Sequence, residues 1–84
     1  MTKLLASTGA VLGTFSVGTE PTGVAFDGAN IWVANFGSSN VTKLLASTGA
    51  VLGTFSMGPD PFGVAFDGAN IWVASYNSDT VWKL

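Results

Sequence analysis

The side chains that could take part in acid–base or metal chemistry are few, and they do not form a catalytic set. The chain of 84 residues has five acidic residues, three basic residues, no histidine and no cysteine. The commonest general base and metal ligand is therefore absent, and disulfides and thiolate metal sites are excluded. Glu20 or Asp60 could pair with Asp79 as an acid and a base, but the sequence offers no polar partner set for such a pair. We expect no enzymatic activity, no metal site and no cofactor.

Two further motifs could bind a ligand, but each has a simpler structural interpretation. The segment Asp27–Asn30 (DGAN), repeated at Asp67–Asn70, shares its first residues with calcium-binding loops. The full spacing of oxygen ligands in such loops is absent, and Asp-Gly is typical of a tight turn between two strands. Trp32 and Trp72 could stack on a ligand, but their place in the apolar run IWVA predicts a position in the core.

The composition indicates a small folded domain and argues against two classes of partner. Hydrophobic residues make up 48% of the chain and charged residues 10%, with a net charge of −2. This balance argues against disorder and against binding to nucleic acid, which needs clustered basic residues. No apolar run approaches the roughly 20 residues of a membrane-spanning helix, so we expect no membrane partner.

An internal repeat of 40 residues organises the whole chain. Thr2–Val41 aligns without gaps on Thr42–Val81, with 31 of the 40 positions identical, and Val81–Leu84 begins a third copy that matches Val41–Leu44. A period near 40 residues with four strands per unit is typical of a propeller blade. We therefore treat residues 1–84 as a single unit, with repeats 2–41 and 42–81 and a partial third repeat at 82–84.

Each repeat is expected to contain four strands. Alternating or β-branched runs are separated by the turn signals Ser-Thr-Gly-Ala and Asp-Gly-Ala-Asn, and by a loop in which Pro21 or Pro61 should end strand pairing. The expected order from the inner to the outer strand is Gly23–Asp27, Ile31–Asn35, Val41–Ser47 and Val51–Met57. The run IWVA is apolar on both pleat faces, which predicts a strand that is covered on both sides.

The same residues resemble the YVTN family of β-propeller repeats over the whole chain. The matching features are a strand ending in Asn35, a G-S-x-N-x-V turn and strand, a T-G-x-V turn, a strand ending in V-G, and the motif P-x-G-V-A-F. The resemblance implies four-stranded blades in a ring, commonly seven in the family. Some members with similar repeats are lyases that use histidine and a metal, and this chain has no histidine to take that role.

We predict an all-β fold, a β-propeller with four-stranded antiparallel blades and two blades per chain, in a ring closed by homo-oligomerisation. Two blades would expose flat apolar faces and open strand edges, and a cyclic head-to-tail assembly would cover them. A trimer of six blades is preferred because fewer chains lose their freedom on closure, and a tetramer of eight blades comes next.

One blade should be shared between neighbouring chains, because nine strands can be read where two blades need eight. A neighbour would donate the outer strand, Val11–Val17, and the third strand has two candidates, the first residues of the chain and the segment ending at Leu84. We favour the C-terminal segment because Trp82 can bury more area than Thr2. The residues assigned to closure of the oligomer are Thr2, Leu4, Val11, Phe15, Val81, Trp82 and Leu84.

The nine positions at which the repeats differ lie in two loop zones, which a propeller would place on one face. This face carries acidic and aromatic side chains that suit a sugar, a small cation or a peptide. Drift after duplication explains the differences as well, because loops tolerate change. The function predicted first is that of a non-enzymatic, self-assembling β-propeller module, either a minimal or an engineered, duplicated propeller fragment. The alternatives are a lectin-like or small-ligand or peptide binding protein that uses this face and, more remotely and only from the resemblance, a propeller lyase. The candidate ligand-face residues are Glu20, Thr22, Asn35, Phe36, Asp60, Phe62, Tyr76 and Asp79.

Overall fold

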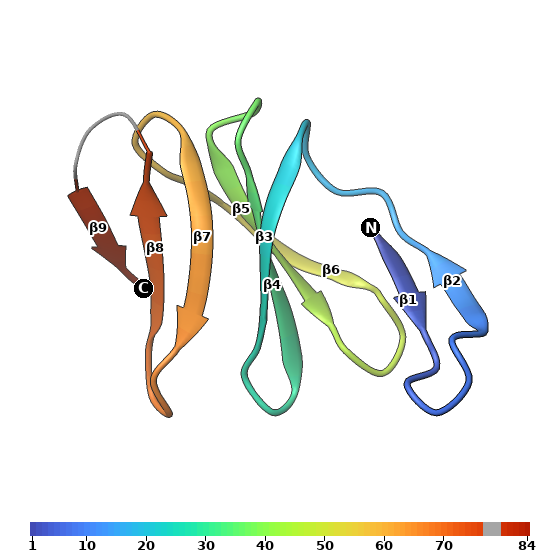
Figure 1. Cartoon of the computed structure of the whole chain (residues 1–84). Coiled ribbons are helices and arrows are strands. Elements are labelled where there is room, and N and C mark those ends of the chain that lie inside the picture. Colours follow the sequence, from blue (N-terminus) through green and yellow to red (C-terminus); the bar gives the residue numbers. More distant parts are fainter. Residues whose placement is uncertain (77–79) are drawn as a thin grey trace.

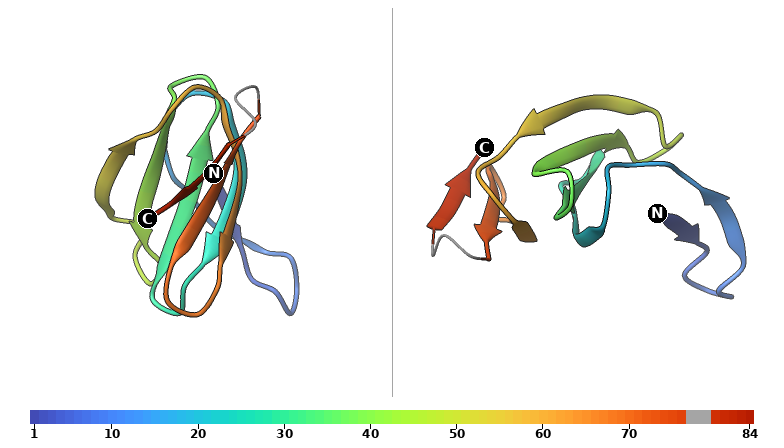
Figure 2. Two further views of the ribbon diagram at one scale, coloured as in Figure 1. Left: turned by 90° about the vertical axis from the view of Figure 1, so that its left-hand side faces the viewer. Right: turned by 90° about the horizontal axis from the view of Figure 1, so that it is seen from above.

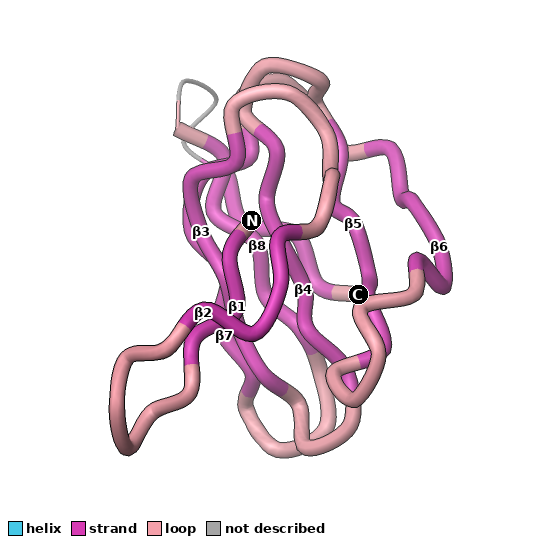
Figure 3. Tube along the Cα trace, turned by 90° about the vertical axis from the view of Figure 1, so that its right-hand side faces the viewer, coloured by secondary structure: helices cyan, strands magenta, loops and turns pink. Residues whose placement is uncertain are grey.

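The protein is an all-β chain built from antiparallel sheets. A computed structural model describes residues 1–76 and 80–84, and these ranges contain strands and turns without a helix (Figure 3). The predicted strands are present, with ends that differ from the expected ones by a few residues. They are β1 (Thr2–Leu4), β2 (Val11–Thr14), β3 (Pro21–Phe26), β4 (Asn30–Asn35), β5 (Asn40–Leu45), β6 (Val51–Ser56), β7 (Pro61–Phe66), β8 (Ile71–Ser75) and β9 (Thr80–Lys83).

The strands form a two-stranded hairpin, β1-β2, a four-stranded sheet, β3-β4-β5-β6, and a three-stranded sheet, β7-β8-β9. The order in the four-stranded sheet is the one predicted from the sequence. The pairing also repeats with the period of 40: Trp32 lies opposite Lys43 in the four-stranded sheet, and Trp72 lies opposite Lys83 in the three-stranded sheet. Equivalent residues of the two repeats are therefore paired in the same register.

The three sheets follow one another along an arc (Figures 1 and 2). The hairpin lies at one end of the arc, the four-stranded sheet in the middle and the three-stranded sheet at the other end, so the two termini lie far apart (Figure 1). Strands β3 and β7 are in contact on one side of the arc, while β2 and β6 lie on the opposite side (Figure 2). The whole chain measures 38 × 27 × 21 Å.

The expectation that Pro21 and Pro61 end strand pairing is wrong. Pro21 and Pro61 are the first residues of β3 and β7, and they lie opposite Asn35 and Ser75 in the ladders. Proline lacks an N–H group, but the first residue of an edge strand can do without one. The preceding acidic residue makes the turn, with a positive φ of 52° or 58° in the two repeats, a backbone conformation that few residues other than glycine adopt.

The core lies between the four-stranded and the three-stranded sheets. Side chains alternate across a strand, so Trp32 and Val41 share one face of the four-stranded sheet, which we call its front face. Ile71 and Val73 share the opposite face of the three-stranded sheet, its back face. These four residues form one buried cluster, against which Val64 and Met57 pack. The front face of one sheet therefore packs on the back face of the next.

Candidate functional site

The packing between the two larger sheets shows how this chain covers an apolar sheet face. On the front face of the four-stranded sheet, Trp32 is 8% exposed, and Val41 and Ala34 are fully buried. Close approach of the two sheets requires glycine at position 23, because an added Cβ there would lie 3.1 Å from the Cα of Gly63 and would overlap the Phe62 carbonyl oxygen. The core position predicted for Trp32 is confirmed.

The same face of the three-stranded sheet is uncovered in the single chain. Trp72 is 38% exposed and Val81 is 62% exposed, although they occupy the repeat positions of Trp32 and Val41. Together with Ala74 they border an open apolar hollow. The core position predicted for Trp72 is therefore not reached within one chain. The run Ile71–Ala74 is identical to Ile31–Ala34, so the difference at the tryptophan arises from the neighbouring sheet and the fourth strand that the three-stranded sheet lacks.

The back face of the four-stranded sheet is only partly covered. Val33 and Leu44 are buried, but Val24 and Phe26 on β3 are 53% and 57% exposed. The hairpin lies next to the four-stranded sheet (Figure 1), and its Lys3 ammonium donates a hydrogen bond at 3.1 Å to the carbonyl oxygen of Ala46 in the turn after β5. One chain thus presents an uncovered front face at one end of the arc and a partly uncovered back face at the other.

The residues assigned to oligomer closure lie at the two ends of the arc. Phe15 is half-buried, and the others are exposed. Trp82 on β9 lies against Gly58, where an added Cβ would be 2.6 Å from the indole ring. At the opposite end, β1 pairs with β2 through Thr2 and Thr14. Both candidates for the third strand of a shared sheet therefore hold the register expected of that strand. The exposed closure residues are Thr2, Leu4, Val11, Val81, Trp82 and Leu84.

Each inner hairpin is fixed by an aspartate that the sequence identified only as a turn residue. The Asp27 carboxylate accepts hydrogen bonds at 2.9 and 2.7 Å from the backbone N–H groups two and three residues further on, and one at 2.9 Å from the Trp32 indole N–H. The indole hydrogen bond, followed by the backbone hydrogen bonds, holds the pKa of Asp27 well below its usual range. Asp67 and Trp72 repeat the arrangement at 2.7 Å, with the same direction of pKa shift. The predicted turns are confirmed, and each also orients a tryptophan on the front face.

The two variable loop zones meet at one end of the sheets. The backbone N–H of Phe36 donates to the carbonyl oxygen of Glu20 at 2.9 Å, and that of Tyr76 donates to Asp60 at 2.8 Å. The Thr22 hydroxyl donates to the Phe62 carbonyl oxygen at 2.8 Å and so links β3 to β7. The loops that join strands within the inner hairpins lie at the opposite end (Figure 1).

Three of the candidate ligand-face residues form an aromatic cluster at this end. The ring centroids of Phe62 and Tyr76 are 5.6 Å apart, and Phe36 lies 6.3 and 6.4 Å from them with its ring edge-on. Phe62 is 46% exposed and Tyr76 is 64% exposed, whereas Phe36 is half-buried. The carboxylates of Glu20 and Asp60 belong to the turns beside them. Sequence reasoning assigned these side chains to one face but did not predict their mutual contact.

Asn35 does not belong to the exposed ligand face, which corrects the prediction. Its side chain is fully buried, and its amide group donates hydrogen bonds to the side-chain oxygens of Asn40 and Thr42 at 2.9 and 2.8 Å. Its carbonyl oxygen accepts no hydrogen bond from the residues that the structure describes. The last residue of a central strand is covered by the loops around it, so its amide links β4 to β5. Asp79 lies outside the described residues.

Within residues 1–76 and 80–84 the structure contains no group of three or more acidic residues that could hold a metal ion. The same ranges contain no helix long and apolar enough to cross a membrane.

Comparison with known proteins reveals a similarity of fold. The sequence matches no protein family and no curated protein. The structure is similar to part of the Kuenenia stuttgartiensis hydrazine synthase, with a TM-score of 0.90 and 25% sequence identity over 99% of this chain. The matched segment is 25% of that chain, so this protein corresponds to about a quarter of its length.

Proposed function

We propose that this chain is a non-enzymatic, self-assembling β-propeller module of the YVTN type. In this proposal the four-stranded sheet is a complete blade, and the three-stranded sheet is a blade that another copy completes. The strand order from inner to outer and the face-to-face sequence of sheets along an arc support the assignment. The similarity to a segment of a larger protein supports a fold that occurs as part of a longer chain.

The observation that carries the proposal is the difference between Val41 and Val81. The first is fully buried and the second is 62% exposed, although each lies in the same register opposite an alanine of the preceding strand. Val41 also has Phe55 of β6 on its other side, whereas β9 is the last strand of its sheet. The chain also exposes the surface that would cover Val81, namely the back face of the four-stranded sheet at Val24 and Phe26. Burial of the exposed part of Val81 alone would contribute about 1–2 kcal/mol to each contact.

A second copy would also complete the three-stranded sheet. β9 is the last strand of the three-stranded sheet, and the pairing of β5 with β6 provides the template for β9 with β2 of another copy. That template places Trp82 opposite Thr14 and Lys83 opposite Gly13 of the second copy. The contact of Trp82 with Gly58 supports β9 as the third strand, so β1 would be displaced from β2 on assembly.

A closed ring follows from repeating one contact between copies. The front face of one copy meets the back face of the next, which is a head-to-tail interface, and such interfaces generate rings when the rotation closes. Three copies with six blades lose less association entropy than four copies with eight blades. The proposal is therefore a trimer, with the tetramer as the next choice.

Amide hydrogen exchange of β9 tests the proposal. We expect the amides of Val81 and Lys83, which point away from β8, to be protected at concentrations at which the copies assemble and to lose that protection on dilution. A β9 that exchanges as a free edge strand at every concentration, while β4 and β5 remain protected, would overturn the proposal.

A second candidate function is ligand binding at the aromatic cluster. The exposure of this cluster is the observation that favours it. The exposed faces of Phe62 and Tyr76 could stack on the apolar face of a sugar ring, and Glu20 and Asp60 would accept hydrogen bonds from its hydroxyl groups. A glycan array tests this function with Tyr76→Ala as the control. Binding by the wild type that the variant loses would support it, and no binding at high protein concentration would exclude it.

A further inference from the structure

We propose that the apolar cavity between the hairpin and the four-stranded sheet receives Trp72 of a second copy, which stacks there on Phe15. This inference rests on the proposed self-assembly and names the side chain on which the contact depends. It follows from comparing the surroundings of Trp32, which are complete within one chain, with those of Trp72, which are not.

The surroundings of Trp32 provide the template. Its ring stacks on Phe55 of β6 with centroids 5.6 Å apart and an angle of 29° between the planes. The Lys43 ammonium lies 5.1 Å from its ring centroid, a favourable cation–π distance. Ile71 on the back face of the next sheet belongs to the same buried cluster. A phenylalanine, a lysine and an isoleucine therefore surround the indole, and the isoleucine comes from the neighbouring sheet.

Trp72 has only part of these surroundings. Its indole N–H donates to Asp67 at 2.7 Å, and the Lys83 ammonium lies 5.5 Å from its ring. No aromatic ring of the described residues stacks on it, because the three-stranded sheet has no counterpart of β6. The indole is consequently held in the orientation of Trp32 with one side uncovered.

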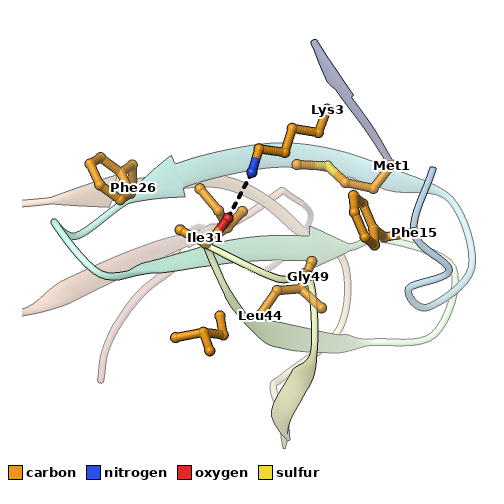
Figure 4. A pocket seen from close by; sticks show the side chains of 9 residues that line it. Met1, Lys3, Phe15, Phe26, Ile31, Leu44 and Gly49 are labelled. Carbon is orange, nitrogen blue, oxygen red and sulfur yellow. Dashed lines mark hydrogen bonds between the residues drawn. The ribbon is translucent and has the colours of Figure 1, made fainter. Parts of the chain in front are cut away.

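The missing groups stand at the other end of the same chain. Phe15 occupies the repeat position of Phe55, and Ile31 occupies that of Ile71. Both line an apolar cavity of about 170 Å³, as Figure 4 shows. An added Cβ at Gly49 would overlap the Phe15 ring, so this ring is seated against the turn that follows β5. No aromatic ring within the described ranges stacks on Phe15.

The character of the cavity agrees with this occupant. Its lining is almost entirely apolar, and two of its walls, Met1 and Lys3, leave with β1 on assembly and so make room for an indole. Its polar rim is the Lys3 ammonium (Figure 4), which stands at the repeat position of Lys43 and Lys83. When β9 of the second copy replaces β1, its Lys83 takes the place of Lys3 and brings Trp72 with it.

A double-mutant cycle of Phe15→Ala and Trp72→Ala tests the contact, with the midpoint concentration of assembly as the readout. Each single variant should weaken assembly at least tenfold. If the two losses were independent, their factors would multiply in the double variant. For a stacked pair, we expect the double variant to assemble about 2- to 10-fold more tightly than that product. Gly63→Ala is the control, because Gly63 lies on the inner strand β7, at the opposite edge of the three-stranded sheet from β9, and its loss should combine additively with Phe15→Ala. Circular dichroism of each variant verifies the fold.

A cross-link provides the second readout. The chain has no cysteine, so copies carrying Phe15→Cys and differently tagged copies carrying Trp72→Cys should form a disulfide between the two tags when mixed and oxidised. An assembled protein whose cycle is additive, or whose mixed copies form no such disulfide, overturns the inference and leaves self-assembly standing. A wild type that does not assemble at all overturns the proposed function itself.

Discussion

A substitution at Gly63 should separate the stability of the single chain from its proposed contact with another copy. At the equivalent position 23, an added Cβ would overlap the Phe62 carbonyl oxygen and lie 3.1 Å from the Cα of Gly63. At position 63 an added Cβ has no atom within 4 Å. Within one chain, β7 lies next to β3. In the proposed assembly, β3 of a second copy would lie next to β7 in the same way. Gly63→Ala should therefore disturb only the contact between copies.

The size of the effect follows from the packing. Ordinary carbon contacts begin at about 3.4 Å, so the two inner strands would have to separate by at least a few tenths of an ångström around the new methyl group. Such overpacking costs about 1–3 kcal/mol, which corresponds to a loss of about 5- to 150-fold for each contact between copies. The isolated chain should keep its stability or gain a few tenths of a kcal/mol, because alanine restricts the unfolded chain more than glycine does.

The assay compares Gly63→Ala with Gly23→Ala. Chemical denaturation at low concentration measures the single chain, and light scattering over a concentration series measures assembly. We expect Gly23→Ala to lower the free energy of unfolding and Gly63→Ala to leave it unchanged while assembly weakens. If Gly63→Ala assembles as tightly as the wild type, β7 has no neighbouring strand from a second copy, and the reasoning is refuted.

Three further predictions concern the same surfaces and the hairpin turns. Val41→Ala should lower the free energy of unfolding of the single chain by about 2 kcal/mol because it leaves a cavity in the core, whereas Val81→Ala should change it by less than about 0.5 kcal/mol and weaken assembly instead; equal effects in denaturation would contradict the account. The pKa values of Asp27 and Asp67 are lowered by folding, so their stabilising effect is complete at neutral pH and is lost as the pH falls below about 4. Asparagine at both positions should flatten this acid-induced fall in the thermal midpoint, and an unchanged pH profile would argue against the hydrogen bonds. Deletion of Trp82–Leu84 should weaken assembly without unfolding the four-stranded sheet, and an unchanged assembly would show that β9 is not the third strand.

Much of the fold could be predicted from the sequence because each strand and turn signal occurs in both copies of the repeat. Turn signals at Asp27–Asn30 and the alternation in the strands define the order in the four-stranded sheet, and the apolar run around Trp32 marks the central strand. The missing N–H of Pro21 predicts the loss of a hydrogen bond in the ladder, yet Pro21 is paired with Asn35. At the first residue of an edge strand no such bond is needed, and the positive φ of Glu20 makes the turn instead.

The candidate site could be predicted only in outline. The position of the two loop zones places Phe36, Phe62 and Tyr76 at one end, but their contact depends on how closely β3 approaches β7. Asn35 ends a predicted strand at a position where the repeats differ, which suggests an exposed face, and it is nevertheless buried because the loops fold over the end of β4. The hydrogen bond from Trp32 to Asp27 had a signal in the sequence, an aspartate five residues before a tryptophan across a tight turn, repeated in both copies.

The contrast between Val41 and Val81 could not be predicted from local sequence at all. Both residues occupy the same position of the repeat. Their exposure differs because the four-stranded sheet has a neighbouring sheet on its front face and a fourth strand beside β5, and the three-stranded sheet has neither among the described residues. The information resides in the arrangement of whole sheets, which composition and spacing do not determine.

Native mass spectrometry of the wild-type protein tests the central claim most directly. The account predicts a principal species with three times the 8.6 kDa mass of the chain, or four times that mass for the larger ring, which dissociates on dilution. A folded species that keeps the mass of a single chain at high concentration would contradict it.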